Sequence, residues 1–342
     1  MKPAMKVEDL CVDLVTRRQK KRIVDHVEFE VYPGECLGIL GESGSGKSMS
    51  LKAILGLLDK NFQVSGQAVF DDKNLIDAPG EELRKLRGNQ IGMVLQNPMT
   101  CFDPLYRIGS QMAETFAMHT DWNGEKIRSV SLEVLDQMRI HDGAEVLEKY
   151  PHQLSGGMLQ RIMIGIAMAL SPELLIADEP TTALDVTIQA QILELMKELQ
   201  KKTHMGIIFI THNLGVVAEI CDKVSVMYAG KIVEQGPVDD IFYKPGHPYT
   251  VGLLRSMPRV DAESYERLIP IEGTPVDMLN PPEGCPFAPR CEHAMKICLQ
   301  KMPPYVELGE GHRSACWLRV QDQLDKAGQE KPVQDQEVSG RE

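Results

Sequence analysis

The sequence predicts an α/β protein with a mostly parallel sheet, and three observations lead to this prediction. Short apolar runs alternate with longer amphipathic stretches between residues 36 and 210, which is the pattern of strands joined by crossover helices. A glycine-rich turn at residues 41–48 lies between an apolar run and a helical pattern. Two carboxylates follow the apolar run at residues 174–177. Both features belong at the carboxyl edge of a parallel sheet, where such proteins bind ligands.

The individual elements follow from hydrophobic periodicity and from the turn residues between them. We predict strands where apolar residues alternate or run together, at residues 7–15, 23–31, 36–40, 64–70, 91–95, 174–177 and 207–210. We predict helices where the apolar spacing is three to four residues, at 49–58, 81–86, 106–150, 155–170 and 189–202. The long helical stretch interrupts the alternation, so residues 97–170 are expected to form a helical subdomain.

Bulk properties exclude several classes of protein. The chain has 342 residues and a formal net charge of −12, so we expect no broad nucleic-acid surface, because phosphate backbones demand a basic face. It contains no apolar run of the ~18 residues that a membrane span needs. The charged N-terminus lacks the apolar region of a signal peptide. We therefore expect a cytoplasmic protein that works at a membrane only by docking on other chains.

The turn at residues 41–48 fits the phosphate-binding pattern G-x-x-x-x-G-K-[ST] in the strand–loop–helix context that the pattern requires. Glycines let backbone N–H groups close around phosphate oxygens, and the helix N-terminus adds a favourable dipole. In this pattern the lysine reaches the β- and γ-phosphates and the following hydroxyl binds Mg²⁺. The expected nucleotide contacts are Gly41, Ser43, Gly44, Ser45, Gly46, Lys47, Ser48 and Met49.

Two further motifs complete a candidate hydrolytic site. Asp178 and Glu179 end a buried strand, where Asp178 can hold Mg²⁺ beside Ser48 and Glu179 can act as general base on the attacking water. Residues 155–157, Ser-Gly-Gly, open a helix and would form a second anion site. One nucleotide needs one phosphate loop, so this second site suggests a nucleotide held between two subunits.

These motifs, in this order, resemble the nucleotide-binding subunit of ATP-binding cassette (ABC) transporters over residues 5–260. Residues 41–48 resemble Walker A, residues 174–179 Walker B and residues 154–161 the family signature. Gln96 resembles the Q-loop glutamine, Asp185 the D-loop aspartate within Ala183-Leu184-Asp185, and His212 the switch histidine. The resemblance implies a P-loop NTPase core that binds and hydrolyses ATP.

The resemblance also implies roles for these residues. Gln96 would touch Mg²⁺ or the attacking water, and His212 would contact the γ-phosphate and Glu179. Ser155, Gly156 and Gly157 would bind the ATP of the opposite subunit, with Asp185 at the dimer interface. The family stacks adenine on an aromatic residue ahead of Walker A, but residues 12–24 contain none. A guanidinium plane, from Arg17 or Arg18, is the alternative.

The texture changes near residue 245, where prolines recur and exclude long helices or central strands. Four cysteines lie in this segment, Cys285, Cys291, Cys298 and Cys316. Their chemistry allows zinc, an iron–sulfur cluster or buried thiols, and the spacing lacks the paired pattern that zinc favours. Residues 271–291, with His247-Pro-Tyr-Thr before them, resemble the C-terminal domain of oligopeptide, dipeptide and nickel importer ATPases. That resemblance implies a four-iron–four-sulfur cluster on the four thiols.

We thus expect an ABC domain at 1–250, a small irregular cysteine-rich domain at 251–326 and a disordered tail at 327–342. The implied partners are a homologous second ATPase, forming a heterodimer, two membrane permeases and, indirectly, an extracytoplasmic substrate-binding protein. The location would be peripheral, on the cytoplasmic face of the inner membrane.

Cargo is the open choice in this interpretation. Leu159 and residues 96–100 favour the nickel branch, whereas the long cysteine-rich domain favours the peptide branch, which we place first. A soluble ABC ATPase outside transport is the alternative from another class. Such proteins usually carry two cassettes or a coiled-coil insertion, and this chain shows one cassette and no sustained heptads.

Overall fold

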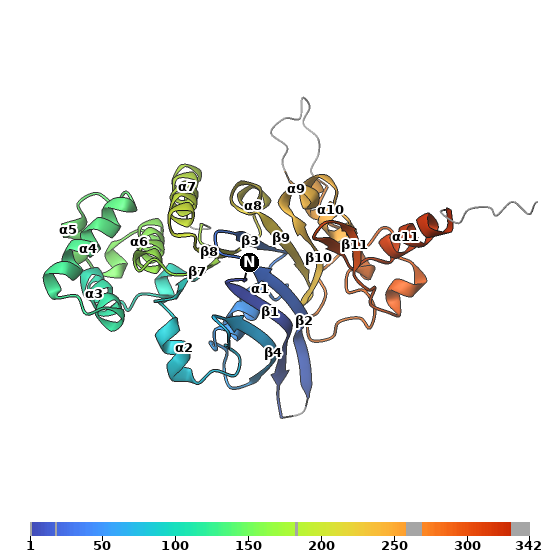
Figure 1. Ribbon diagram of the computed structural model, residues 1–342, viewed down its shortest axis with the longest axis horizontal. Helices are drawn as coiled ribbons and strands as arrows, with labels where there is room; N and C mark the ends of the chain where they lie inside the picture. The colour runs from blue at the N-terminus through green and yellow to red at the C-terminus, as the bar shows by residue number, and fades with distance from the viewer. Residues whose placement is uncertain (1, 18, 182–183, 258–268, 330–342) are drawn as a thin grey trace, which may run out of the picture.

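The computed structural model describes residues 2–17, 19–181, 184–257 and 269–329. Two sheets lie at the centre of the molecule. A bundle of helices extends from one side of them and the C-terminal region from the other (Figure 1). The larger sheet has the strand order β11-β12-β10-β9-β3-β8-β7-β6. Its strands are β3 (Cys36–Leu40), β6 (Ile91–Val94), β7 (Leu174–Asp178), β8 (Gly206–Thr211), β9 (Lys223–Tyr228), β10 (Lys231–Pro237), β11 (Val306–Gly309) and β12 (His312–Ser314).

The prediction of a mostly parallel sheet is correct only for the core of this sheet. Strands β6, β7, β8, β3 and β9 pair in parallel, and β10, β12 and β11 continue the sheet in antiparallel pairs. A second sheet, wholly antiparallel, has the order β2-β1-β4-β5. Its strands are β1 (Met5–Val15), β2 (Lys20–Val31), β4 (Phe62–Phe70) and β5 (Lys73–Asn74). Short turns join β1 to β2, β4 to β5, β9 to β10 and β11 to β12, and such turns allow antiparallel pairing. The architecture is therefore mixed α/β.

The core strands are buried on both faces. In β3, Cys36 and Leu40 join the core with the helices α6 (Gly156–Ala169), α7 (Val186–Thr203) and α8 (Leu214–Ile220). Leu37 and Ile39 point the other way, into a core shared with the antiparallel sheet and with α1 (Lys47–Ile54). This alternation explains why the central strands read as continuous apolar runs.

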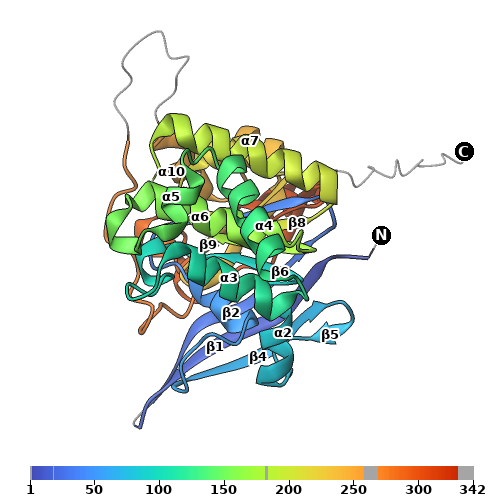
Figure 2. The ribbon, with the colours of Figure 1, turned by 90° about the vertical axis from the view of Figure 1, so that its left-hand side faces the viewer.

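The predicted helical subdomain consists of short helices around α6, to one side of the sheets (Figures 1 and 2). Its other members are η1 (Pro98–Thr100), α3 (Ile108–His119), α4 (Gly124–Gln137), α5 (Gly143–Glu148) and η2 (Pro151–Gln153). Asn123 and Ser155 cap α4 and α6 by accepting a hydrogen bond from the backbone N–H of the third residue of each helix. Among the described residues, no helix is both long and apolar enough to cross a membrane.

The C-terminal region, residues 238–257 and 269–329, is attached to the main sheet through a buried carboxylate. Glu234 in β10 is fully buried and accepts hydrogen bonds from the backbone N–H groups of Gly246 (2.5 Å) and His247 (2.9 Å) and forms one with His312 Nε2 (2.8 Å). These contacts join the sheet to the start of α10 and to β12. The region contains α9 (Val238–Tyr243), α10 (Pro248–Arg255), η3 (Ala288–Arg290), η4 (Lys296–Leu299) and α11 (Trp317–Gln329).

Helix α11 continues through Gln329, three residues into the segment for which we predict disorder. Residues 330–342, the rest of that segment, lie outside the described residues. The remaining described helix is α2 (Gly80–Leu86), which follows the antiparallel sheet.

Close packing of α6 on α4 yields a stability prediction. A Cβ added at Gly165 would lie 2.6 Å from Val134 Cγ1 and 2.9 Å from Met138 Cγ. We therefore expect Gly165→Val to lower the free energy of unfolding of the full chain by roughly 1–3 kcal/mol, as overpacking does in other cores. Urea denaturation followed by circular dichroism measures this. The control is Gly124→Val, where an added Cβ meets nothing within 4 Å; equal midpoints for the two variants would contradict the packing argument.

Candidate nucleotide-binding site

The phosphate loop follows β3 and leads into α1, as the sequence predicts. Gly41 leaves no room for a side chain, because an added Cβ would lie 2.2 Å from the carbonyl oxygen of Met227 in β9. Gly46 has φ +106° and forms the N-cap of α1, a backbone conformation that L-residues with a side chain rarely adopt. The loop is therefore shaped by glycine at the two positions where it enters from the sheet and turns into the helix.

Lys47 lies inside this loop. Its Nζ donates hydrogen bonds to the carbonyl oxygens of Gly41 (2.7 Å) and Glu42 (2.7 Å) and to Ser45 Oγ (3.3 Å). The residue is 5% exposed, and this burial lowers the pKa of Lys47 while Glu179, Asp178 and Glu42 act in the opposite direction. The ammonium therefore holds the loop backbone in a curled form from within. A cation in this position is suited to bind phosphate oxygens.

Ser48 and Asp178 meet across the sheet edge. Ser48 Oγ donates a hydrogen bond of 2.8 Å to Asp178 Oδ1, although 130 residues separate them in the sequence. Burial raises the pKa of Asp178, the hydrogen bond from Ser48 lowers it, and the neighbouring Glu179 raises it further. A hydroxyl and a buried carboxylate are the oxygen donors that Mg²⁺ uses beside nucleotide phosphates, so this pair fits that ion.

Glu179 is held between two of the predicted residues. Gln96 Nε2 donates to Glu179 Oε2 at 2.9 Å, and His212 Nδ1 lies 3.0 Å from Glu179 Oε1. Gln96 follows β6, Glu179 follows β7 and His212 follows β8, so the parallel register brings all three to one edge. Glu179 also has a positive φ of 48°. A carboxylate oriented in this way can accept a proton from a water molecule.

The residues predicted to act on a second nucleotide lie at two helix starts. Ser155 is the N-cap of α6 and its Oγ accepts a hydrogen bond from the N–H of Met158 at 3.3 Å. At Gly156 an added Cβ would meet nothing within 4 Å, so this helix start is open. Asp185 caps α7 by accepting from the N–H of Ile188 at 2.9 Å. The neighbouring Ala183, part of the predicted D-loop, lies outside the described residues.

Gln160 lies within the predicted signature motif, but no role was predicted for it from the sequence. It is fully buried in α6, and its Nε2 donates a hydrogen bond of 2.6 Å to the carbonyl oxygen of Pro180, directly after Glu179. The contact ties the helix of the signature motif to the turn that carries the carboxylate. The available signal was a lone amide within the stretch 159–170, whose other residues, apart from Arg161, are apolar or glycine.

The four C-terminal cysteines come together in the fold. Cys285, Cys291, Cys298 and Cys316 line one small cavity of about 20 Å³, together with Phe287 and Trp317. Burial raises the pKa of Cys285 to about 12 and also raises the pKa of Cys291 and Cys316. Tetrahedral zinc holds its sulfurs roughly 3.8 Å apart, from a Zn–S distance of about 2.3 Å. Among the described residues, no three of these thiols form a group with all sulfurs within 4.8 Å.

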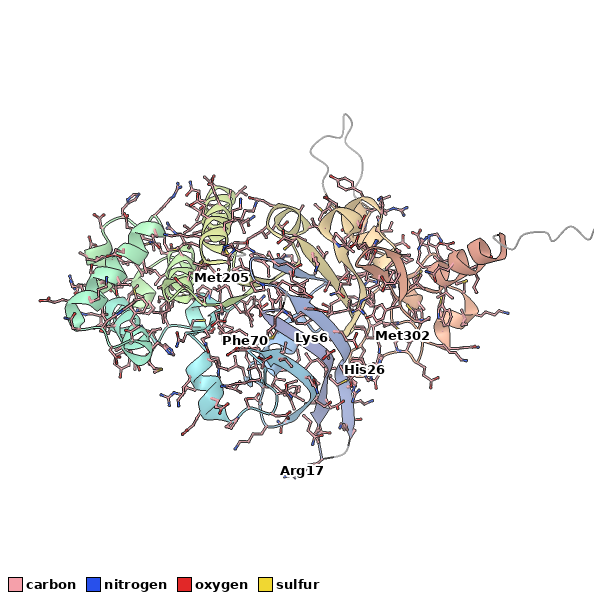
Figure 3. All side chains as sticks on the ribbon, viewed as in Figure 1. Lys6, Arg17, His26, Phe70, Met205 and Met302 are labelled. Carbon is pink, nitrogen blue, oxygen red and sulfur yellow. The ribbon has the colours of Figure 1, made fainter. Side chains whose placement is uncertain are left out.

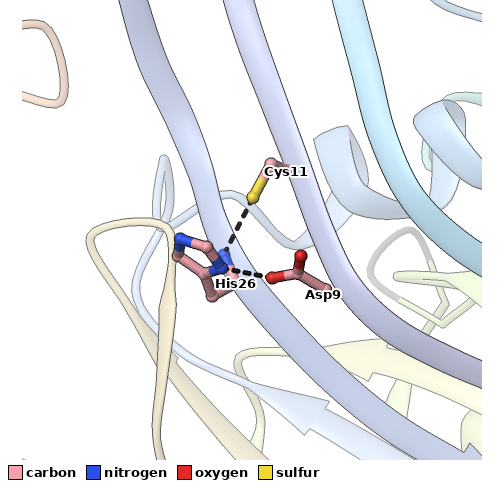
Figure 4. Close-up of side chains that lie close together, drawn as sticks. All are labelled: Asp9, Cys11 and His26. Carbon is pink, nitrogen blue, oxygen red and sulfur yellow. Dashed lines mark hydrogen bonds and ion pairs between the residues drawn. The ribbon is translucent and has the colours of Figure 1, made fainter.

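A different set of potential metal ligands does come that close. Asp9 and Cys11 in β1 and His26 in β2 have ligand atoms within 4.8 Å of one another (Figure 4). His26 is paired with Asp9, and the sulfur of Cys11 accepts a hydrogen bond from Arg22 Nη1 at 3.2 Å. A metal ion would have to displace this guanidinium, so we assign none to the cluster.

The structure does not assign the adenine contact to either of the two arginines considered for it. Arg17 lies in the exposed turn that joins β1 to β2 (Figure 3). Arg18 lies outside the described residues.

Comparison with known proteins identifies the chain. Residues 24–182 match the ABC transporter family, and residues 233–298 match the oligopeptide/dipeptide transporter C-terminal region. The chain is 49% identical to the dipeptide transport ATP-binding protein DppD of Lactococcus lactis, with 92% of this chain and 90% of that protein covered. It is 46% identical to the oligopeptide transport ATP-binding protein OppD of Escherichia coli, with 94% of each covered.

Solved structures agree with these relatives. A dimeric ATP-binding cassette, MJ0796, bound to ADP and Pi superimposes with a TM-score of 0.63 at 26% identity, over 68% of this chain and 98% of that one. Fold and site together define an ATPase of the ABC class. Within that class, the chain belongs to the family of oligopeptide and dipeptide ABC transporter ATP-binding subunits.

The Ser48–Asp178 contact generates a prediction about magnesium. Ser48→Ala removes the hydroxyl beside Asp178, so we expect the magnesium concentration for half-maximal ATPase activity to rise about tenfold, the effect of one lost interaction of about 1.4 kcal/mol. Titration of activity with MgCl₂ at fixed ATP measures this. Ser50→Ala serves as the control. Ser50 lies in the same helix, and its Oγ donates a hydrogen bond of 3.0 Å to the Gly46 carbonyl oxygen and not to Asp178. An unchanged requirement in Ser48→Ala would contradict the assignment.

Proposed function

We propose that this chain binds ATP with Mg²⁺ and hydrolyses it to power import of di- or oligopeptides through a membrane-embedded ABC transporter. The observation that carries the proposal is the Glu179 carboxylate, bonded by Gln96 and His212 at the edge where the phosphate loop and Asp178 also lie. The named roles of the dipeptide and oligopeptide relatives support peptides as cargo.

The site residues divide the chemical work. Residues of the phosphate loop, with Lys47, hold the β- and γ-phosphates, and Ser48, Asp178 and Gln96 would hold Mg²⁺. Bound Mg²⁺ neutralises negative charge on the phosphate oxygens. Glu179 accepts a proton from the attacking water, whose oxygen bonds to the γ-phosphorus while the bond from that phosphorus to the β–γ bridging oxygen breaks. His212 orients the Glu179 carboxylate.

A complete site needs a second ATPase subunit. In this proposal Ser155, Gly156 and Gly157 of one subunit bind the γ-phosphate held by the other, and Asp185 lies at the interface. The open start of α6 supports this arrangement, because an added Cβ at Gly156 would meet nothing within 4 Å and an anion can therefore approach the helix N-terminus there. The partner is a homologous ATPase, which makes a heterodimer that closes on ATP and reopens after hydrolysis.

The other partners follow from the role in transport. The ATPase pair would dock on two permease subunits at the cytoplasmic face of the inner membrane as a peripheral component. An extracytoplasmic substrate-binding protein would deliver the peptide to the permeases.

We further propose that Cys285, Cys291, Cys298 and Cys316 hold a four-iron–four-sulfur cluster in the C-terminal domain, residues 251–326. Their convergence on one cavity supports this proposal. Their spacing along the chain lacks the paired pattern that zinc sites favour, which favours a cluster over a zinc ion.

Glu179→Gln tests the catalytic assignment. The amide cannot accept the proton, so hydrolysis should fall by about a hundredfold or more, while ATP binding persists and traps the closed dimer with the partner ATPase. Phosphate release and size-exclusion chromatography in the presence of ATP measure the two effects. Glu173→Gln, at the opposite end of β7, is the matched control. Hydrolysis within threefold of wild type would refute the general-base role.

Uptake by cells tests the cargo. In a strain whose own copy is replaced by the Glu179→Gln variant, accumulation of a radiolabelled dipeptide or tripeptide should be lost and should return with the wild-type chain. Nickel-63 uptake is followed in the same strains. Loss of nickel uptake with intact peptide uptake would assign the chain to the nickel branch.

Elemental analysis tests the cluster. Protein purified without exposure to air should contain about four irons per chain, the content of a four-iron cluster. Cys298→Ser should remove the iron, whereas Cys101→Ser, which changes an exposed thiol, should not. One zinc per chain, or four thiols that alkylate in the native protein, would exclude the cluster.

A further inference from the structure

The phosphate loop has a contact with the C-terminal region that none of its motifs anticipates. Arg290, at the end of η3, forms a two-pronged ion pair with the Glu42 carboxylate, Nη1 to Oε2 at 2.6 Å and Nη2 to Oε1 at 3.1 Å. Glu42 is the second residue of the loop, 248 residues away in the sequence. The Arg290 side chain is 4% exposed, so this is not a loose surface pair.

Arg290 is itself held in place by the surrounding chain. Its Nε donates to the carbonyl oxygen of Glu272 at 3.0 Å and its Nη2 to that of Ile271 at 3.3 Å. Its guanidinium carbon lies 5.9 Å from the centre of the Tyr228 ring. The hydrogen bonds to Glu42 raise the pKa of Arg290 above its usual value. A planar guanidinium fixed in this way is suited to orient a carboxylate.

Glu42 also forms a hydrogen bond through its backbone N–H. Its N–H donates a hydrogen bond of 2.9 Å to the hydroxyl oxygen of Tyr249 in α10. Tyr249 is fully buried, and its ring lies 5.3 Å from that of Phe287, which is close to Arg290 in the sequence. Side chain and backbone of the same loop residue therefore both bind groups beyond the ATP-binding motifs.

A further hydrogen bond connects Glu42 to the phosphate-binding lysine. The carbonyl oxygen of Glu42 accepts the hydrogen bond from Lys47 Nζ at 2.7 Å. The contacts thus run from Arg290 to the Glu42 side chain, and from the Glu42 carbonyl to Lys47. A cavity of about 300 Å³ beside this path is lined by Gly41, Glu42, His212 and Ile271, so loop and C-terminal region share one space.

We propose that Arg290 is a positioning residue for ATP binding, through which the C-terminal region sets the shape of the phosphate loop. It acts by fixing Glu42, and it touches neither nucleotide nor metal. The inference rests on the function proposed above, since it concerns the affinity of that ATP site. The C-terminal region is in this view a part of the ATPase rather than a separate attachment.

Isothermal titration of the full-length chain with ATP and Mg²⁺ tests this role. We expect Arg290→Gln to weaken ATP binding about tenfold, the change associated with losing a charged hydrogen bond. Arg290→Lys should fall between, because an ammonium cannot make the two-pronged contact. In the assembled transporter, KM for ATP should rise while kcat at saturating ATP changes less than twofold.

Glu42→Gln removes the same ion pair from the loop side and leaves the other contacts of Arg290 intact. It should weaken ATP binding as much as Arg290→Gln, and the double variant should be no weaker than either single one. Arg313→Gln is the matched control. Its side chain contacts Gln235 at 3.0 Å and the Tyr305 ring, and it joins the C-terminal region to the sheet away from the loop.

The outcomes separate the two levels of the proposal. A wild-type chain that binds no ATP would refute the function itself. Normal ATP affinity in Arg290→Gln or Glu42→Gln, additive effects in the double variant, or an equal loss in Arg313→Gln would overturn the positioning role alone. Thermal unfolding of each variant shows whether a fall in affinity accompanies loss of the fold, in which case Glu42→Gln decides.

Discussion

The parallel register of β6, β7, β8, β3 and β9 is the constraint on which the site depends. All five strands end at one edge, so the segments that follow them emerge side by side although they are far apart along the chain. Burial on both faces prevents a shift of register, because a slip by one residue would turn each strand's side chains to the wrong core. The contact of Glu179 with Gln96 and His212 is a consequence of that order.

Much of this could be predicted from the sequence because the deciding signals are local. Glycine and lysine spacing marks the phosphate loop, and each catalytic candidate lies within two residues of the end of a short apolar run, as Gln96, Glu179 and His212 do. Strands β3, β6, β7 and β8 were predicted to within about one residue, since their apolar runs have clear ends. Strands β9 and β10 of the same sheet were not predicted. Local patterns also located α6 and α7, whose caps Ser155 and Asp185 are typical N-cap residues.

Features that depend on distant contacts could not be predicted in this way. The pair of Glu42 and Arg290 has no signature, because either residue alone reads as an ordinary surface charge. Strands β11 and β12 are short and partly polar, so their composition does not predict that they extend the main sheet. The cysteines fall in the same class, since their spacing along the chain says little about the cavity that they share.

The pairing of β12 with β10 has a consequence for the chain during its synthesis. The two strands pair only at Glu234 with Ser314 and at Gln235 with Arg313, yet β12 is synthesised long after β10. Until then, the outer edge of β10 presents unpaired N–H and C=O groups, the feature by which sheets recruit strands from other molecules. A nascent or truncated chain ending before residue 300 is therefore exposed to aggregation at this edge, and the last strands act as its cover.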